Sequence, residues 1–600
     1  MTAPERTTVK ESGAAAWRTP AELDEYRTTP DYATTLDYLE RLASTYPKVV
    51  RIENFGTTGE GRVLTIVIAS KDGTFDPDAI HASGRVILLV QNAIHAGEMD
   101  GKDACLALLR DLLQDPAMSH ALDHVVLVFI PVYNIDGHER RSAYSRINQN
   151  GPALSGWRAN GTNLNLNRDY LKADAPETRA FFRMFQRWSP DFFVDNHVTD
   201  GADFQYDVTF ILDDAEDVFP GTAQWIHDRV RPELERQVNA SGHLAFPGPI
   251  FLNDETDPAQ GLAAHDNPPR FSTGRMILEN RPGLLVELHM LKDYRTRVTG
   301  NYQILRALLD VLNQDAAKLI TLNRQADQDA AALAFDPVRR AAFPLCFEKS
   351  GQNRPVAFRG YAFTREPSPV SGGMAVHYNR TLWNVTLPMD PGFKVAVSVS
   401  LPAGYIIPPQ WTDVIDVLEV HGVRLERTEH TWTGMVEKYR CTGMRRPGKP
   451  FEGRYPILRG GNVESAIGEF GTCSRSFATL TFPPGSAVVQ LDQRLSKVAI
   501  HWLEPEAPDS ALRWGFFDSV FEQKESGDAR VLEDLARDEL ARSPELRAEF
   551  EQRVRTDPGF ATDSNARLAF FYDRSPWGLA NRVGEYPVGR LISVEGIPLR

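Results

Sequence analysis

The sequence predicts an α/β domain, followed by a β-rich region and a helical C-terminal segment. Two features of the first half predict the α/β domain: continuous apolar runs rich in valine and isoleucine, and helical patterns between them. Continuous apolar runs are typical of strands buried on both faces, as in a parallel or mixed sheet covered by helices. In the second half, apolar residues alternate with polar ones, which is typical of antiparallel strands.

The predicted elements of the α/β domain follow one another in order along the chain. Strands are expected at 85–90, 125–132, 192–198 and 283–290. Helices are expected at 103–114, 177–188, 222–238 and 301–322. In the last helix, leucines recur on one face, as expected of a helix packed on a sheet. We expect this domain to cover residues 20–330.

The second half is divided by its pattern into two parts. "KVAVSVSLPAG" alternates with a period of two and stops at a proline, and "AVVQLDQ" and "KVAIHWLEP" have a similar pattern. Residues 336–510 are therefore predicted to form a β-rich domain. Residues 528–554 have a helical pattern, so 511–600 is predicted to be mainly helical.

The composition of the chain limits the classes of molecule that the protein is expected to bind. The chain of 600 residues has a net charge of −14, whereas nonspecific binding to nucleic acid or anionic membranes needs a basic surface. We therefore expect no nucleic-acid partner and no membrane insertion. Residues 1–17 lack the apolar stretch of an export signal. We expect a cytoplasmic protein, or an exported one whose signal is absent from this chain. Cys441 and Cys473 could pair in the exported case.

Polar residues follow the predicted strands at the points where these strands end. In chain order they are His95 and Glu98 in "HAGE", Asn134 and Asp136 in "NIDG", His197 in "NHV", and Glu287 in "VEL". Ligands bind at the carboxyl ends of strands in open α/β sheets. We therefore expect these side chains to meet at one edge of the sheet.

Two histidines and a glutamate are an attested ligand set for a catalytic zinc ion, which keeps a fourth position for water. His95 and Glu98 would supply a closely spaced pair, and His197 the distant third ligand. Glu287 would then remain unligated and free to accept a proton. A His-x-x-Glu pair alone is also typical of a solvated loop. The prediction of one Zn²⁺ per chain therefore rests on the whole set of residues.

The ordered motifs "HAGE", "NIDG" and "NLNRDY", a strand-end histidine and a "VEL" glutamate resemble the zinc carboxypeptidases of the carboxypeptidase A/B/T family. The resemblance covers residues 20–325. It implies an eight-stranded mixed sheet flanked by helices, and hydrolysis of the C-terminal residue of a peptide or protein. It also implies that His95, Glu98 and His197 hold the zinc. Zinc-bound water would attack the scissile bond, with Glu287 as general base.

The resemblance also implies how substrate is held. Asn167 and Arg168 match the pair that binds the substrate's C-terminal carboxylate, for which a planar guanidinium is well suited. Arg158 is our choice for the arginine that stabilises the oxyanion, and Arg146 is its competitor. One departure concerns Asn165, which stands where family members often carry an aspartate that orients a zinc histidine. An amide brings no charge to that position.

The segment "NPPRFSTGR" (267–275) lies where the family shapes the pocket for the C-terminal side chain. Arg270 and Arg275 predict a cationic pocket that favours acidic C-terminal residues. The alternative is that both arginines point to solvent or pair with acids such as Asp266 and Glu279. The segment before Glu287 contains no tyrosine to match the mobile active-site tyrosine of the digestive enzymes.

Two other functions share some of these features. Deacylases that resemble aspartoacylase and succinylglutamate desuccinylase also combine a His/Glu pair, an Asn-Arg pair and a later histidine. They cleave small N-acyl amino acids. The long first half and the distant Glu287 favour the peptidase. A non-enzymatic role would be favoured by loss of a ligand or of Glu287, and all four residues are present. The sequence leaves the role of 336–600 and the oligomeric state open.

Overall fold

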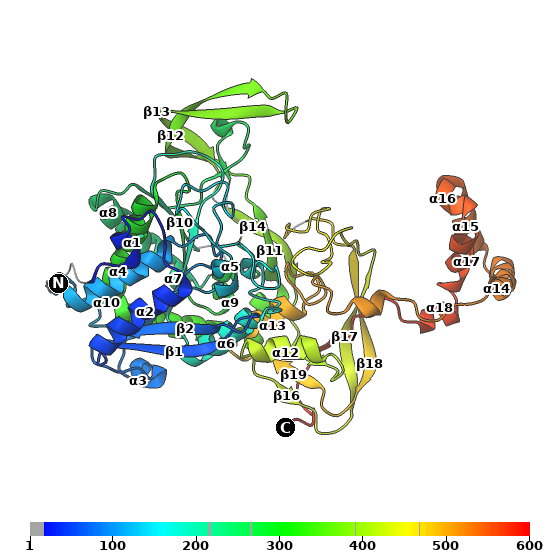
Figure 1. Cartoon of the computed structure of the whole chain (residues 1–600). Coiled ribbons are helices and arrows are strands. Elements are labelled where there is room, and N and C mark those ends of the chain that lie inside the picture. Colours follow the sequence, from blue (N-terminus) through cyan, green and yellow to red (C-terminus); the bar gives the residue numbers. More distant parts are fainter. Residues whose placement is uncertain (1–16, 214–217, 264–266, 391, 467) are drawn as a thin grey trace, which may run out of the picture.

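A computed structural model describes residues 17–213, 218–263, 267–390, 392–466 and 468–600. The first half forms a sheet flanked by helices, and a long hairpin extends from one end of it (Figure 1). A second β-rich body packs against the α/β domain and carries the C-terminal helices, which project away from the rest (Figure 1).

The α/β domain is built on an eight-stranded mixed sheet with the order β1-β2-β4-β3-β5-β10-β6-β7. Its strands are β1 (Val50–Thr57), β2 (Val63–Ala69), β3 (Val86–Gln91), β4 (Val125–Ile130), β5 (Phe192–Val198), β6 (Val208–Leu212), β7 (Ala245–Phe246) and β10 (Gly283–Leu288). The four apolar runs of the sequence are the central strands β4, β3, β5 and β10, which run parallel to one another. The predicted α/β fold with a mixed sheet is confirmed.

Helices cover both faces of this sheet. They are α1 (Pro20–Leu23), α2 (Tyr32–Thr45), α3 (Pro77–Ala82), α4 (Asp100–Gln114), α5 (Ile135–Glu139), α6 (Pro176–Trp188), α7 (Pro220–Trp225), α8 (Arg231–Ala240), α9 (Ser272–Leu278) and α10 (Tyr294–Ala332). Val86, Leu88 and Val90 of β3 pack with α4 and α10, whereas Ile87 and Leu89 pack with α6. Burial on both faces explains why the central strands are continuously apolar.

The second half contributes three further sheets, one of them shared with the first half. Their strands are β8 (Phe251–Leu252), β9 (Leu262–Ala263), β11 (Phe343–Lys349), β12 (Arg354–Pro367), β13 (Met374–Met389), β14 (Phe393–Val399), β15 (Gly404–Ile407), β16 (Glu426–Arg427), β17 (Trp432–Thr442), β18 (Thr472–Phe482), β19 (Ala487–Gln490) and β20 (Gly589–Leu591). β11 pairs with β14, and the long hairpin β12–β13 joins β9 and β8 of the first half. The third sheet has the order β16-β19-β15-β20-β17-β18.

Two details of the second half differ from the sequence predictions. The segment "KVAIHWLEP", predicted as a strand, lies largely in helix α13 (Ser496–Leu503), all of whose residues are buried. A short run that is apolar all round does not distinguish a buried helix from a strand. In the predicted helical segment, residues 589–591 form β20 inside the six-stranded sheet. Cys441 and Cys473 lie in register on β17 and β18 and form a disulfide.

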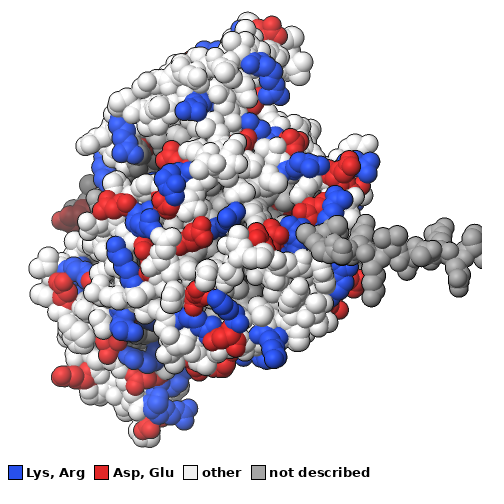
Figure 2. Space-filling view, turned by 90° about the vertical axis from the view of Figure 1, so that its left-hand side faces the viewer, with Lys and Arg blue, Asp and Glu red and all other residues white. Residues whose placement is uncertain are grey.

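The remaining helices are α11 (Pro337–Ala341), α12 (Thr412–Val420), α14 (Ala529–Arg542), α15 (Pro544–Thr556), α16 (Pro558–Thr562), α17 (Ser564–Tyr572) and α18 (Pro576–Ala580). Helices α14, α16 and α17 share a small core of their own, made by Ala536, Phe560, Phe570 and Phe571. On the face drawn in Figure 2, acidic and basic side chains are interspersed. Within the described ranges, no helix has both the length and the apolar character needed to cross a membrane.

A buried charge network joins the two halves. Glu279, at the end of α9, accepts hydrogen bonds from Arg275 (2.9 Å), from Gln186 of α6 (3.0 Å) and from Arg494 of the second half (3.0 Å). Glu279 and Arg275 are completely buried. Because buried charges are costly unless they are paired, this network requires all its members together.

We therefore expect Glu279→Ala to lower the free energy of unfolding by about 3–5 kcal/mol, because it leaves the Arg275 guanidinium buried without its partner. Urea unfolding followed by circular dichroism measures the change. Asp534→Ala is the matched control, since Asp534 pairs with Arg537 on the surface of α14. That variant should lose no more than about 1 kcal/mol. Equal losses in the two variants would contradict the role of the buried network.

Candidate active site

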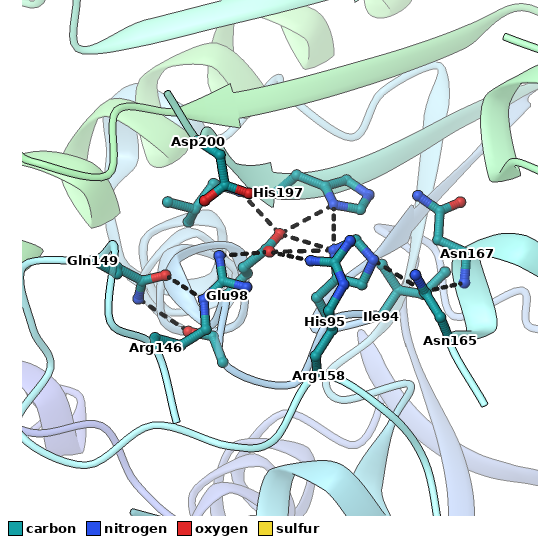
Figure 3. A network of polar contacts seen from close by, with 12 residues as sticks. Ile94, His95, Glu98, Arg146, Gln149, Arg158, Asn165, Asn167, His197 and Asp200 are labelled. Carbon is teal, nitrogen blue, oxygen red and sulfur yellow. Dashed lines mark hydrogen bonds and ion pairs between the residues drawn. The ribbon is translucent and has the colours of Figure 1, made fainter. Parts of the chain in front are cut away.

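The three candidate zinc ligands converge at the carboxyl edge of the sheet. His95 and Glu98 lie in the turn after β3, and His197 lies on β5. His95 Nδ1 is 3.2 Å from Glu98 Oε2, His197 Nδ1 is 3.1 Å from the same oxygen, and the two Nδ1 atoms are 3.2 Å apart. All three side chains are buried and point toward one another (Figure 3).

The chemistry of these three atoms fits a metal ion. The Nε2 of His95 faces the Asn165 oxygen at 3.1 Å, and that of His197 faces Asp195 Oδ2 at 2.8 Å. Because both oxygens only accept, each Nε2 donates, and in the neutral imidazole each Nδ1 carries a lone pair. Two lone pairs and a carboxylate oxygen repel one another unless a cation lies between them. Metal–ligand distances of about 2.0–2.2 Å in a tetrahedral site place ligand atoms about 3.3–3.6 Å apart.

The pKa shifts of His95 and Glu98 suit a metal. Burial lowers the pKa of His95 to about 3, so its imidazole is neutral near pH 7. Burial opposes ionisation of Glu98, but His95 and Arg146 outweigh it and hold the pKa of this carboxyl well below its usual value. A neutral imidazole and an ionised carboxylate are the forms that bind metal. His197 differs: burial lowers its pKa, but Asp195 and Glu98 outweigh burial and raise it well above the usual value, so a metal ion would displace a proton from this imidazole.

Glu287 lies beside this triangle of atoms. In the parallel pairing of β10 with β5, its register partner is His197. Its Oε2 is buried and has no hydrogen-bond partner among the described residues. Burial raises the pKa of Glu287 from 4.5 to about 8. The carboxyl therefore faces the cavity and is free to exchange a proton.

Both competing arginines reach Glu98. Arg146 Nη2 is 2.9 Å from Glu98 Oε1, and Arg158 Nη1 is 3.5 Å from the same atom (Figure 3). Arg158 is 40% exposed and lines the cavity, whereas the Arg146 side chain is 9% exposed and does not line it. Arg158 is therefore the better placed of the two to reach a substrate.

Asn167 and Arg168 lie on a short 3₁₀ turn, residues 166–168, at the same edge. The Asn167 side-chain oxygen accepts a hydrogen bond from the Ser272 amide (2.9 Å). The Arg168 guanidinium lies 4.3 Å from the centre of the Phe271 ring, and it lines the cavity. Burial lowers the pKa of Arg168 to about 10, so this side chain keeps its charge at neutral pH. From the second half, Glu464 approaches it at 3.7 Å.

The predicted cationic pocket is wrong. Arg275 is completely buried and bonds to Glu279 and to His421 of the second half. Arg270 is buried and bonds to Asp509, also of the second half. Neither arginine lines the cavity. One of the neutralising acids is more than 200 residues away in sequence, so the segment 267–275 alone could not reveal this pairing.

The cavity at the site has a volume of about 230 Å³, and Thr199, Asp200 and Thr209 line it beside the polar groups described above; the rest of its wall is apolar. Its wall includes Ile211 of β6 and Phe271. It also includes the segment 249–251, which leads into β8. Phe271 lies in the segment 267–275 that the resemblance assigns to the pocket, whereas no motif marked Ile211 or the segment 249–251 in the sequence. They come together only through the pairing of β6 with β10 and of β8 with β9.

Hydrogen bonds from the "NIDG" motif hold the loops of the site in position. The Asn134 amide donates to the carbonyl oxygens of Ile94 (3.3 Å) and Arg158 (3.0 Å), and its oxygen accepts from the Gly137 amide (2.9 Å). A Cβ atom at Gly137 would lie 2.5 Å from the Trp157 oxygen, so only glycine fits there. The motif therefore fixes the loops that carry His95 and Arg158.

Comparisons with known proteins agree with this geometry. Residues 35–209 match the family model described as zinc carboxypeptidase. Over these residues the chain is similar to the zinc carboxypeptidases, in agreement with its sequence motifs. Members of that family are hydrolases that act on peptide bonds, and the chain is an enzyme of this class.

Carboxypeptidase 2 of Trichophyton rubrum is 24% identical over 453 residues, which cover 72% of this chain and 74% of the relative. Human carboxypeptidase D is 26% identical over 137 residues, which cover 22% of this chain and 9% of that protein. The carboxypeptidase A structure from Helicoverpa armigera covers 50% of this chain and 79% of its own, with 15% identity and a TM-score of 0.38. The match to the fungal relative is longer than the α/β domain, so the likeness extends into the second half.

The pKa of Glu287 has a consequence for stability in the metal-free, chelator-treated protein. A folded-state pKa of about 8, above the ordinary 4.5, means that folding becomes less favourable as pH rises between these values. A glutamine at this position is neutral at every pH, so its burial does not make folding less favourable as pH rises. We therefore expect Glu287→Gln to be more stable than the wild type near about pH 9, with the difference shrinking toward about pH 4. Thermal unfolding at several pH values measures this. A difference that does not change with pH would contradict the assignment.

Proposed function

We propose that the protein is a zinc-dependent metallocarboxypeptidase that removes the C-terminal residue of a peptide or protein. The supporting observation is the triangle of ligand atoms from His95, Glu98 and His197 next to the unpaired carboxyl of Glu287. One zinc ion per chain would be held there. It would polarise the scissile carbonyl and lower the pKa of a water molecule.

In this proposal Glu287 is the general base. Its Oε2 accepts a proton from the attacking water and delivers it to the leaving amine nitrogen. Its position opposite His197 in the strand register supports this role, as does the lack of a hydrogen bond to its Oε2 from any residue that the structure describes. Arg158, at the cavity wall, stabilises the negative charge that develops on the carbonyl oxygen.

Asn167 and Arg168 bind the free C-terminal carboxylate. An exopeptidase must distinguish a chain end from an internal peptide bond, and a guanidinium can bind both carboxylate oxygens at once. Arg168 is held for this purpose by stacking on Phe271 and by a bond to the Asn167 carbonyl oxygen (2.9 Å). These contacts fix the plane of the guanidinium before substrate arrives.

Two substitutions separate metal binding from catalysis. Glu287→Gln should keep about one zinc per chain and lose about 10²–10⁴-fold in turnover, because it removes the base but no ligand. His197→Ala should lose the zinc itself. Elemental analysis and a peptide-hydrolysis assay measure the two effects. N-acyl amino acids are the control substrates, since a deacylase would prefer them. Wild-type turnover in Glu287→Gln would exclude it as the base.

The apolar cavity wall suggests a preference for apolar C-terminal side chains. We expect peptides that end in Leu or Phe to be cleaved faster than those that end in Glu or Lys. The difference should be at least about 10-fold in kcat/KM, the size expected for misfit in a hydrophobic pocket. Ile211→Asp should shift the preference toward Lys, whereas Arg275→Met should leave the preference unchanged. Equal cleavage of all four peptides would contradict the assignment of this wall.

A further inference from the structure

The two histidines of the proposed metal site have hydrogen-bond partners of different charge. His95 Nε2 faces the side-chain oxygen of Asn165, an uncharged amide. His197 Nε2 faces Asp195 Oδ2 at the shorter distance of 2.8 Å. Residues i and i+2 of a strand lie on the same face, which brings Asp195 and His197 of β5 together.

Asp195 is completely buried and accepts hydrogen bonds from two donors besides His197. Gln91 Nε2 donates to its Oδ1 (3.0 Å), and Ser272 Oγ donates to its Oδ2 (2.5 Å). The Gln91 amide is itself fixed, because its oxygen accepts from the Tyr170 hydroxyl (2.6 Å). With two other donors already bound, Asp195 acts only as an acceptor, and His197 must donate through Nε2. In the neutral, metal-binding form of His197, the lone pair on Nδ1 therefore points toward His95 and Glu98.

Asn165 is held differently. It lies in the loop before the 166–168 turn, and its oxygen also accepts from the Asn167 amide (3.0 Å). Its backbone amide donates to Glu452 of the second half (2.8 Å). The partner of His95 is thus neutral and belongs to a loop, whereas the partner of His197 is charged and belongs to a central strand.

We propose that Asp195 is the positioning residue that sets the strength of metal binding, by fixing the tautomer of His197 and supplying the charge that Asn165 lacks. Partners of this kind raise the basicity of a metal-bound imidazole, and their loss typically costs about 10–100-fold in metal affinity. This inference rests on the proposed zinc site.

The experiment measures zinc affinity by competition with a chromogenic chelator, independently of catalysis. Asp195→Asn should weaken zinc binding by about 10–100-fold. The new amide can donate to His197 Nε2 and so favour the wrong tautomer. Asn165→Ala should weaken it less than Asp195→Asn does. Asn165→Asp in the Asp195→Asn background should restore part of the affinity, because it gives His95 a charged partner.

Asp191→Asn is the matched control. Asp191 is a buried aspartate just before the same strand, and it accepts a hydrogen bond from the Ile87 amide (2.9 Å). This variant should lower stability but leave zinc affinity within about 2-fold of the wild type, well below the loss expected for a metal-orienting partner. The rise in melting temperature on adding zinc should likewise shrink in Asp195→Asn and not in Asp191→Asn. A purely structural role for Asp195 would give the two variants the same rise.

Ser272→Ala is a milder variant for the case that Asp195→Asn does not fold. It removes one hydrogen bond to Asp195, and it should weaken zinc binding in the same direction by a smaller factor. Unchanged affinity in every foldable variant of this network, or a larger loss in Asn165→Ala, would overturn the inference. Absence of zinc binding by the wild type would instead overturn the proposed function.

Discussion

The parallel pairing of β5 with β10 is the constraint on which the site depends. It places His197 and Glu287 side by side at the carboxyl edge of the sheet. Because β3 is the other neighbour of β5, the turn that carries His95 and Glu98 begins at the same edge. A register slip of one residue would turn Glu287 to the opposite face of the sheet. The layers of buried apolar side chains on both faces specify this register, so the core and the site are set by the same pairing.

The second half forms its own β-rich body, and it also bonds to residues that hold the site in place. Glu452 accepts from the Asn165 amide, Asp509 bonds to Arg270, and Arg454 forms two bonds of 2.7 Å with Asp174. These contacts lie on both sides of the 166–168 turn in the chain. The segment proposed to bind the substrate carboxylate is thus held between the sheet and the second half. The long match to a fungal carboxypeptidase, which extends beyond the α/β domain, is consistent with that arrangement.

Much of the α/β fold was predictable from the sequence, because burial on both faces leaves an unmistakable apolar run. The polar residues that interrupt such runs were also predictable as a cluster, and His95, Glu98 and His197 do meet. The partners of Arg275 and Arg270 in the second half were not predictable, because that pairing depends on how the two halves pack. Asp195 was overlooked for a different reason. A lone aspartate in an apolar strand has no spacing motif, although its position two residues before His197 was a usable signal.

The electrostatics of the cavity couple the proposed base to the proposed metal. Glu98 is kept ionised by His95 and Arg146, whereas at Glu287 burial outweighs the attraction of His197 and raises the pKa to about 8. A divalent cation beside Glu287 favours its ionised form, as an opposite charge within a few ångströms does for any carboxyl. The coupling is reciprocal, so ionisation of Glu287 strengthens cation binding to the same extent. A carboxyl without a hydrogen-bond partner is therefore suited to this position, because its charge is stabilised chiefly when the cation is bound.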